Sequence, residues 1–201
     1  MEMSPTELLL GATIQHLELV VTSLIFSIFF GIFFGVISIY YESFSKPIIT
    51  IANIMYSIPA LVIISLIVPI LGLGYFPAFF IIFFGSFLPI VKNTHIGLKN
   101  INNGLIDAAE GMGLTKWQII KYIRFPNAYP SIFAGIKFSS ILINGMAIIT
   151  ALIGSGGLGR VIFEGLTSFN SKKIFLGTIP AVFIAIFLEL FFNQLEKKFT
   201  R

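Results

Sequence analysis

Residues 107–126, DAAEGMGLTKWQIIKYIRFP, form a charged stretch between long hydrophobic runs, and this contrast decides how the chain folds. Signals for two short helices fill the stretch. Thr115 and Gln118 have the three-residue spacing of a capping box, and Gly111 and Gly113 permit a turn just before it. The sequence therefore predicts a polar helix–turn–helix set between membrane-type segments.

The composition outside this stretch indicates an integral membrane protein. Hydrophobic residues make up 56% of the 201 residues and charged residues only 11%, and the mean hydropathy is +0.96. The apolar runs are long enough to cross the hydrocarbon core as helices and too long for barrel strands. Because backbone polar groups in lipid must pair within their own segment, we expect an all-α fold with one membrane domain over residues 1–201.

Hydropathy predicts five membrane spans. Their expected ranges are 19–41, 48–71, 76–96, 131–153 and 174–195. The second span contains Pro59 and Pro69 and closes at Gly72-Leu73-Gly74, so we expect it to be kinked or interrupted. The polar segment, residues 100–126, lies between the third and fourth spans.

Several function classes are excluded or disfavoured by the composition. The chain has no Cys, which excludes disulfides and thiolate chemistry. His16 and His95 are expected at opposite ends of the membrane, so neither a metal site nor a catalytic pair is expected. The net charge of +4 fits basic cytoplasmic loops better than nucleic-acid binding. Residues 1–16 lack Lys and Arg, so the first span is expected to remain in the mature protein.

The distribution of basic residues predicts the orientation. With the N-terminus outside, nine Lys and Arg residues face the cytoplasm and three face outward, with Lys137 inside a span left uncounted. The nine are Lys46, Lys92, Lys99, Lys116, Lys121, Arg124, Lys197, Lys198 and Arg201, and the three are Arg160, Lys172 and Lys173. This bias predicts an outside N-terminus, a cytoplasmic C-terminus and a cytoplasmic polar segment.

The polar segment has a helical pattern of its own. Its first helix is expected to carry an apolar stripe at i, i+3, i+4 and i+7, formed by Leu105, Ala108, Ala109 and Met112. The small Ala108 and Ala109 would let a partner approach closely. The second helix is expected to run from Thr115 to about Arg124, and Pro126 and Pro130 are expected to break it before the fourth span. Ile119, Ile120 and Ile123 are its candidates for burial.

This segment resembles the cytoplasmic coupling loop of the permease subunits of bacterial ATP-binding-cassette (ABC) importers. The family pattern is Glu-Ala-Ala, three residues, Gly, nine residues, then Ile-x-Leu-Pro. Here Asp107-Ala108-Ala109 opens the pattern, Gly113 takes the glycine position, and Ile123-Arg124-Phe125-Pro126 closes it, with Asp for Glu and Phe for Leu. The resemblance implies that Asp107 to Gly113 seats in a groove of an ATPase subunit.

Two further stretches narrow the resemblance. Residues 53–74 and 151–166 are similar to permeases for glycine betaine, carnitine, choline and proline betaine. The resemblance implies a type I importer with the same core as methionine permeases, in the bacterial inner membrane. Its partners would be two ATPases, which hold ATP and Mg, a separate external substrate-binding protein, and a second permease subunit that is either this chain or a paralogue. It implies no catalysis and no bound cofactor or metal in this chain.

Four residues are candidates for the substrate pathway. Asn53, Ser57 and Asn144 are polar within apolar surroundings, and Pro59 bends the second span. The same residues also fit simple packing of membrane helices, and both readings stay open. Two other functions stay open: an importer of methionine or another small solute, and, more remotely, a membrane-embedded enzyme. The enzyme would need clustered acids or His at one depth, which the sequence does not show.

Overall fold

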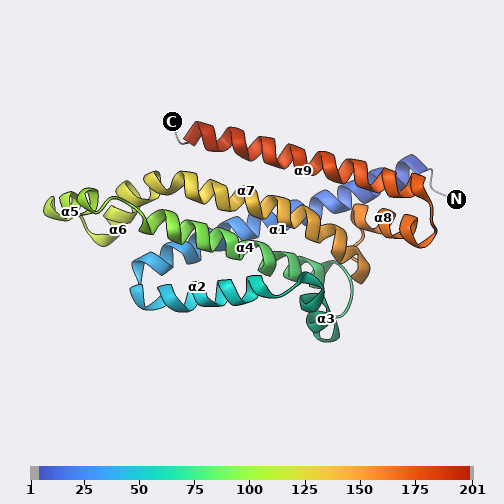
Figure 1. The fold of residues 1–201 in the computed structure, drawn as a ribbon, viewed down its shortest axis with the longest axis horizontal. Helices are drawn as coiled ribbons and strands as arrows, with labels where there is room; N and C mark the ends of the chain where they lie inside the picture. Colours follow the sequence, from blue (N-terminus) through green and yellow to red (C-terminus); the bar gives the residue numbers. More distant parts are fainter. Residues whose placement is uncertain (1–4, 200–201) are drawn as a thin grey trace.

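The computed structural model describes residues 5–199, and every regular element in that range is helical (Figure 1). The all-α expectation is therefore confirmed. In chain order the elements are α1 (Pro5–Tyr40), α2 (Glu42–Ser57), α3 (Ala60–Leu71), α4 (Tyr75–Lys99), α5 (Asn103–Gly111), α6 (Lys116–Ile119), the π-helical turn η1 (Ile120–Arg124), α7 (Phe125–Ile149), the 3-10 turn η2 (Thr150–Ile153), α8 (Gly157–Thr167) and α9 (Ser171–Phe199).

Three long helices, α1, α4 and α7, form the centre of the bundle. Helix α2 packs against α1 and α4, while α9 packs against α7 and α8 on the other side (Figure 1). Ile81, Ile90 and Ile143 are fully buried between the central helices. Many exposed side chains on α1 and α9 are Phe, Ile, Leu and Val. An apolar outer surface around a buried apolar core is what a helix bundle in lipid requires.

The described residues contain four helices long and apolar enough to cross a membrane, and the bent pair α2 and α3 makes a fifth if it counts as one span. The predicted ranges 19–41, 76–96 and 174–195 fall on α1, α4 and α9, which are longer. Each of these helices extends beyond its most apolar stretch. Hydropathy identifies only the part of a helix that lies in the hydrocarbon layer, so it misses the helical ends outside that layer. The Pro5 end of α1 and the polar segment lie at opposite ends of the bundle (Figure 1).

The second span is interrupted, as predicted. Helix α2 ends at Ser57, Ile58 is extended, and Pro59 precedes α3, whose axis turns by 97°. A residue before proline is driven out of the α region, which explains the break at Ile58. Pro69 lies within α3 without breaking it, and α3 ends at Gly72, where φ is +78°.

The expected break between the polar segment and the fourth span is wrong. Residues from Lys116 to Ile153 form one continuous helical run, which includes both Pro126 and Pro130. The wider π turn before Pro126 absorbs the change in hydrogen-bond register, and Phe125 donates to the Ile120 carbonyl. Pro126 then lies in the first turn of α7, where a missing N–H is tolerated.

The glycine-rich turn after η2 has positive φ at Gly154, Gly156 and Gly157, a conformation that glycine adopts readily. The N–H of Gly157 donates to the side chain of Gln15 near the start of α1. Helix α8 follows at once and was not predicted. It closes the end of the bundle where α1 begins (Figure 1).

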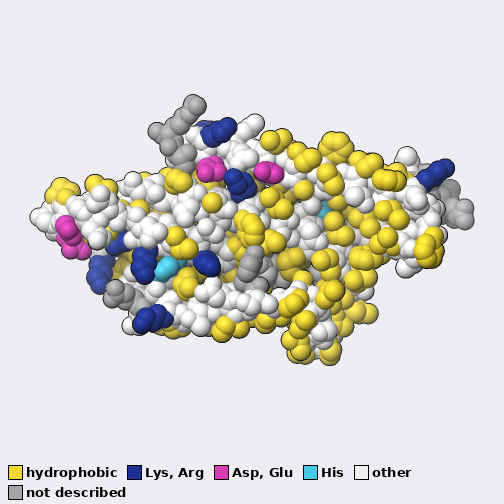
Figure 2. Space-filling view, viewed as in Figure 1, with side chains coloured by type: hydrophobic (Ala, Val, Ile, Leu, Met, Phe, Trp, Pro, Cys, Tyr) yellow, Lys and Arg dark blue, Asp and Glu magenta, His cyan; other side chains and the backbone are white. Residues whose placement is uncertain are grey.

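Basic side chains gather on the half of the molecule that carries α5, α6 and the C-terminal end of α9 (Figure 2). Arg201, one of the nine expected there, lies outside the described residues. At the other end Arg160 and Lys173 pair with Glu164 at 2.8 and 3.5 Å. The hydrogen bond from Arg160 holds the pKa of Glu164 below its usual range.

Candidate functional site

The polar segment projects from the end of the bundle as two short helices joined by a tight turn (Figure 1). The Asn102 side chain accepts from the Gly104 N–H at 2.8 Å and so caps the start of α5. At the other end, the Leu114 N–H donates to the Ala109 carbonyl and the Gly113 N–H to the Glu110 carbonyl. This pair of bonds is a Schellman motif, which needs the φ of +80° found at Gly113.

The expected capping box begins α6. The Gln118 N–H donates to the Thr115 hydroxyl at 3.3 Å, and the Thr115 N–H donates to the Gln118 side chain at 2.8 Å. Both bonds satisfy amides that would otherwise have no partner at the start of the helix. The direction of α6 relative to α5 is therefore set by local hydrogen bonds on both sides of Gly113.

A small apolar core holds the two helices together. Ile106 and Ala109 on α5 and Ile119 on α6 are buried, with Ile123 partly buried against them. Of the three isoleucines expected to be buried, Ile119 and Ile120 are buried and Ile123 is partly buried. Ala109 is 0% exposed, so a surface that a partner meets includes Ala108 but not Ala109.

The exposed part of α5 carries both apolar and acidic side chains. Leu105, Ala108 and Met112 lie on one side of the helix, with Leu105 and Met112 49% and 71% exposed, and Asp107 and Glu110 are exposed on the other side. Three members of the expected apolar stripe therefore point away from the protein. Large apolar side chains on a polar projection are a feature of protein contact surfaces. Throughout, we call these five residues the α5 face.

Arg124, expected from the sequence as a cytoplasmic charge at the end of the second short helix, ties the polar segment to the membrane bundle. The Arg124 guanidinium in η1 donates to the Leu98 carbonyl in the last turn of α4 at 2.6 Å. This carbonyl has no partner within its own helix, since it belongs to the last four residues. A positive charge at a helix C-terminus is favourable as well. The only signal for this role in the sequence is a basic residue at the variable position of the Ile-x-Phe-Pro pattern.

Close packing between α4 and α7 continues this attachment into the bundle. The Ser131 hydroxyl donates to the Asn93 carbonyl at 2.9 Å. Gly97 has no room for a side chain, because a Cβ there would lie 2.7 Å from the Cβ of Ser131. The end of α4 and the start of α7 are therefore held in fixed register directly below the polar segment.

Two of the four pathway candidates line one cavity. Asn53 and Ser57 on α2 face Lys92 and Asn93 on α4 around a space of 400 Å³, which Phe138 of α7 also lines. The Lys92 ammonium donates to the Asn53 side chain at 3.1 Å. Pro59 does not line this cavity and instead lies at the break between α2 and α3.

Asn144, the fourth pathway candidate, lies elsewhere, buried among α1, α7 and α9. Its side-chain oxygen accepts from Nε2 of His16 at 3.1 Å, and its amide donates to the Ala181 carbonyl at 3.2 Å. Both groups of the side chain are thus used in joining three helices. His95 is also engaged within the bundle, through a 2.7 Å hydrogen bond with Ser38. No group of three or more potential metal ligands occurs within residues 5–199.

Comparison with known proteins agrees with this architecture. Residues 27–201 match the model of the family described as binding-protein-dependent transport system inner membrane component. The chain is 33% identical over 192 residues to the carnitine transport permease protein OpuCB of Listeria monocytogenes, covering 96% of this chain and 88% of the relative. It is 38% identical over 153 residues to the glycine betaine/carnitine/choline transport system permease protein OpuCB of Bacillus subtilis, covering 76% and 70%.

Solved structures share the fold at lower sequence identity. The inward-facing methionine ABC transporter MetNI aligns over 100% of both chains with a TM-score of 0.87 and 22% identity. An amino acid ABC transporter with histidines aligns over 98% of this chain and 94% of its own, with a TM-score of 0.73 and 20% identity. The fold, the family model and the relatives agree with the expected permease core. The chain therefore belongs to the family of binding-protein-dependent transport system inner membrane components, the permease subunits of ABC importers.

Proposed function

We propose that this permease imports quaternary ammonium solutes of the glycine betaine, carnitine and choline class, driven by partner ATPases. The relatives named above support this substrate class, since each is a permease for carnitine or for all three solutes. The observation that carries the energetic half of the proposal is the α5 face. It presents an exposed apolar and acidic surface on a capped helix, which connects to α4 through residues 100–102 and to α7 through α6 and η1.

In this mechanism the chain transmits force and does not hydrolyse ATP. ATP and Mg are held by two ATPase subunits, each of which receives one α5 face, with Asp107 and Ala108 in the contact. When the ATPases close, α5 and α6 move together, because the Schellman turn at Gly113 and their shared core make them one unit. Arg124 passes the movement to α4, and the continuous run through Ile123 and Pro126 passes it to α7.

The cavity lined by Asn53, Ser57 and Lys92 is the proposed part of the solute pathway within this chain. It lies where α2 meets α4 and α7, so a movement of α4 against α7 changes its shape. The break at Pro59 lets α2 and α3 turn separately. Asn144 is left out of the proposed pathway, because its hydrogen bonds serve to join helices. A second permease, either this chain or a paralogue, would complete the path, and a separate external protein would deliver the solute.

Methionine is the alternative substrate. The observation in its favour is the fold match to a methionine transporter, and one fold can serve different substrates. Uptake of radiolabelled solutes into cells that express this chain with the genes beside it separates the two. We expect glycine betaine, carnitine or choline to be taken up and methionine not to be. Uptake of methionine alone would contradict the proposed substrate class.

The gathering of basic residues on the half that carries the polar segment supports an orientation with that segment in the cytoplasm. Because the chain has no Cys, single cysteines can report it. Met112→Cys in the polar segment and Phe169→Cys after α8 replace side chains that are 71% and 94% exposed. In spheroplasts, a membrane-impermeant maleimide should label Phe169→Cys directly and Met112→Cys only after lysis. Labelling of both from the same side would contradict a membrane crossing by α7, the span that lies between the two positions.

The turn at Gly113 can be tested with a matched pair of glycines. A Cβ at Gly111 or Gly113 meets nothing within 4 Å, but only Gly113 has positive φ. A β-branched residue in that conformation is strained by about 1–3 kcal/mol. Gly113→Val should therefore misdirect α5 and reduce solute uptake about tenfold at equal membrane expression, whereas Gly111→Val should not. Equal uptake by the two variants would count against a role for the turn in coupling.

A further inference from the structure

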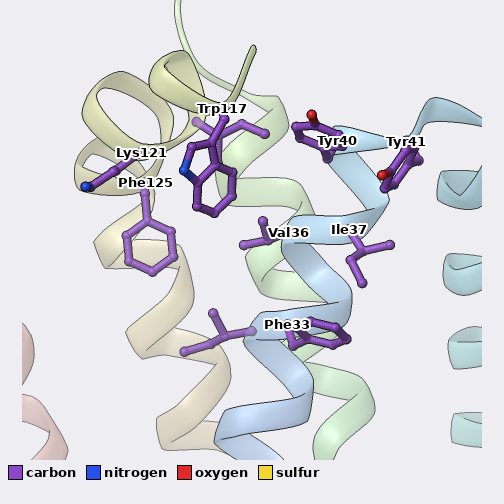
Figure 3. A pocket seen from close by; sticks show the side chains of 10 residues that line it. Phe33, Val36, Ile37, Tyr40, Tyr41, Trp117, Lys121 and Phe125 are labelled. Carbon is purple, nitrogen blue, oxygen red and sulfur yellow. The ribbon is translucent and has the colours of Figure 1, made fainter. Parts of the chain in front are cut away.

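A long apolar groove follows one side of α1, away from the cavity at Asn53. It consists of two cavities that share Ile32 and Phe33. The first, of 580 Å³, lies beside the polar segment and is lined chiefly by Phe33, Val36, Tyr40, Trp117, Lys121 and Phe125 (Figure 3). The second, of 510 Å³, continues along α1 and is lined by Ile25, Ile28, Phe29, Ile32 and Phe33. We call the combined space the α1 groove.

The inner part of the α1 groove fits hydrocarbon. All five residues of the second cavity are apolar, and Phe29 and Phe33 are 65% and 49% exposed. Helix α1 is one of the four helices that pass as membrane spans, so these side chains face the bilayer core. From Ile25 to Tyr40 the helix rises by about 22 Å, about three quarters of the hydrocarbon thickness of about 30 Å. The groove therefore reaches from one interface to beyond the middle of the bilayer.

The outer end of the α1 groove has the chemistry of the headgroup layer. Tyr40, Tyr41 and Trp117 surround it, and these residue types are enriched where membrane meets water (Figure 3). The carbon stem of Lys121 lines the wall while its ammonium points outward from the groove (Figure 3). Among the described residues, the ion pairs do not include Lys121, and its ammonium lies 5.1 Å from the centre of the Tyr122 ring.

The adjoining charges favour an anionic occupant. Arg124 is already bound to the Leu98 carbonyl, and Lys116 lies in a neighbouring cavity together with Glu110. Lys121 is thus the cation at the mouth of the α1 groove itself. A protein helix in the groove would need a carboxylate at the membrane interface to pair with Lys121. A phospholipid already carries its anionic phosphate at that depth.

We propose that the α1 groove binds an anionic phospholipid, with an acyl chain along Ile25 to Val36 and the headgroup beside Lys121. Because α6 and η1 form one wall, the lipid would touch the membrane span and the polar segment at once. It would thereby support the position of α6 from the lipid side. The proposal depends on the groove and its charge, and not on which solute is transported.

The single Trp of the chain lies in the wall of the groove and provides a direct probe. The full chain, with the subunits that copurify with it, is placed in phosphatidylcholine nanodiscs that contain a minority of lipid with brominated acyl chains. Bromine quenches indole fluorescence on contact. Subtracting the signal of Trp117→Phe in the same complex isolates Trp117 from tryptophans in other subunits.

We expect brominated phosphatidylglycerol to quench Trp117 with an apparent affinity about fivefold higher than brominated phosphatidylcholine, since one lysine near the surface contributes on that scale. Lys121→Gln should remove the difference, while Lys116→Gln, on the same short helical run but in the neighbouring cavity, should retain it. Equal quenching by the two lipids in the wild type would overturn the proposal. Protection of Trp117 from both lipids would also overturn it and would show that protein, such as a second copy of the chain, covers the groove.

Discussion

The hydrogen bond from Arg124 to the Leu98 carbonyl is the constraint on which the rest of this molecule depends. The polar segment leaves the bundle at the end of α4 and returns at the start of α7, and this bond joins those two points directly. Hydrogen bonds to charged groups contribute about 1.5–3 kcal/mol, more than a neutral pair. The ring contact between Trp117 of α6 and Tyr40 of α1, with centroids 6.5 Å apart, and the burial of Ile120 add to this attachment.

Close helix packing makes this local bond effective over the length of the bundle. Gly31 and Gly35 on α1 lie one turn apart, and a Cβ at either would lie within 2.6 Å of a side-chain carbon of Ile90 or Thr94 on α4. Small residues that let backbones approach are typical of membrane helix interfaces. Helices α1, α4 and α7 thus form a firm group, whereas α2 and α3, separated by the 97° turn at Pro59, form a looser one. In the proposed mechanism the solute cavity lies where these two groups meet.

Much of this arrangement could be predicted from the sequence, because its signals are local. Hydropathy marked the spans, the capping box at Thr115 and Gln118 has the predicted bonds, and Gly113 has the positive φ that a turn requires. The rest depends on contacts between distant residues. The π turn carries the helix through Pro126, where a proline alone predicts a break.

The candidate site residues also divide into those whose neighbours follow from local spacing and those whose neighbours come from distant parts of the chain. Asn53 and Ser57 fall on one helix face and share a cavity, as a helical spacing of four allows. Asn144 is engaged by His16, which is 128 positions away, and Ala109 is buried by α6. Neither partner follows from local spacing. The role of Arg124 and the α1 groove likewise arise only when α1, α4 and η1 are brought together.

In the proposed mechanism, Arg124 transmits movement of the polar segment to the membrane helices. The most direct measurement is the ratio of solute taken up to ATP hydrolysed by the complete transporter in proteoliposomes, with Arg124→Gln compared with the wild type. Loss of the charged hydrogen bond should lower this ratio by about tenfold or more while the ATPases remain bound and active. An unchanged ratio, with both subunits assembled at wild-type levels, would contradict the claim.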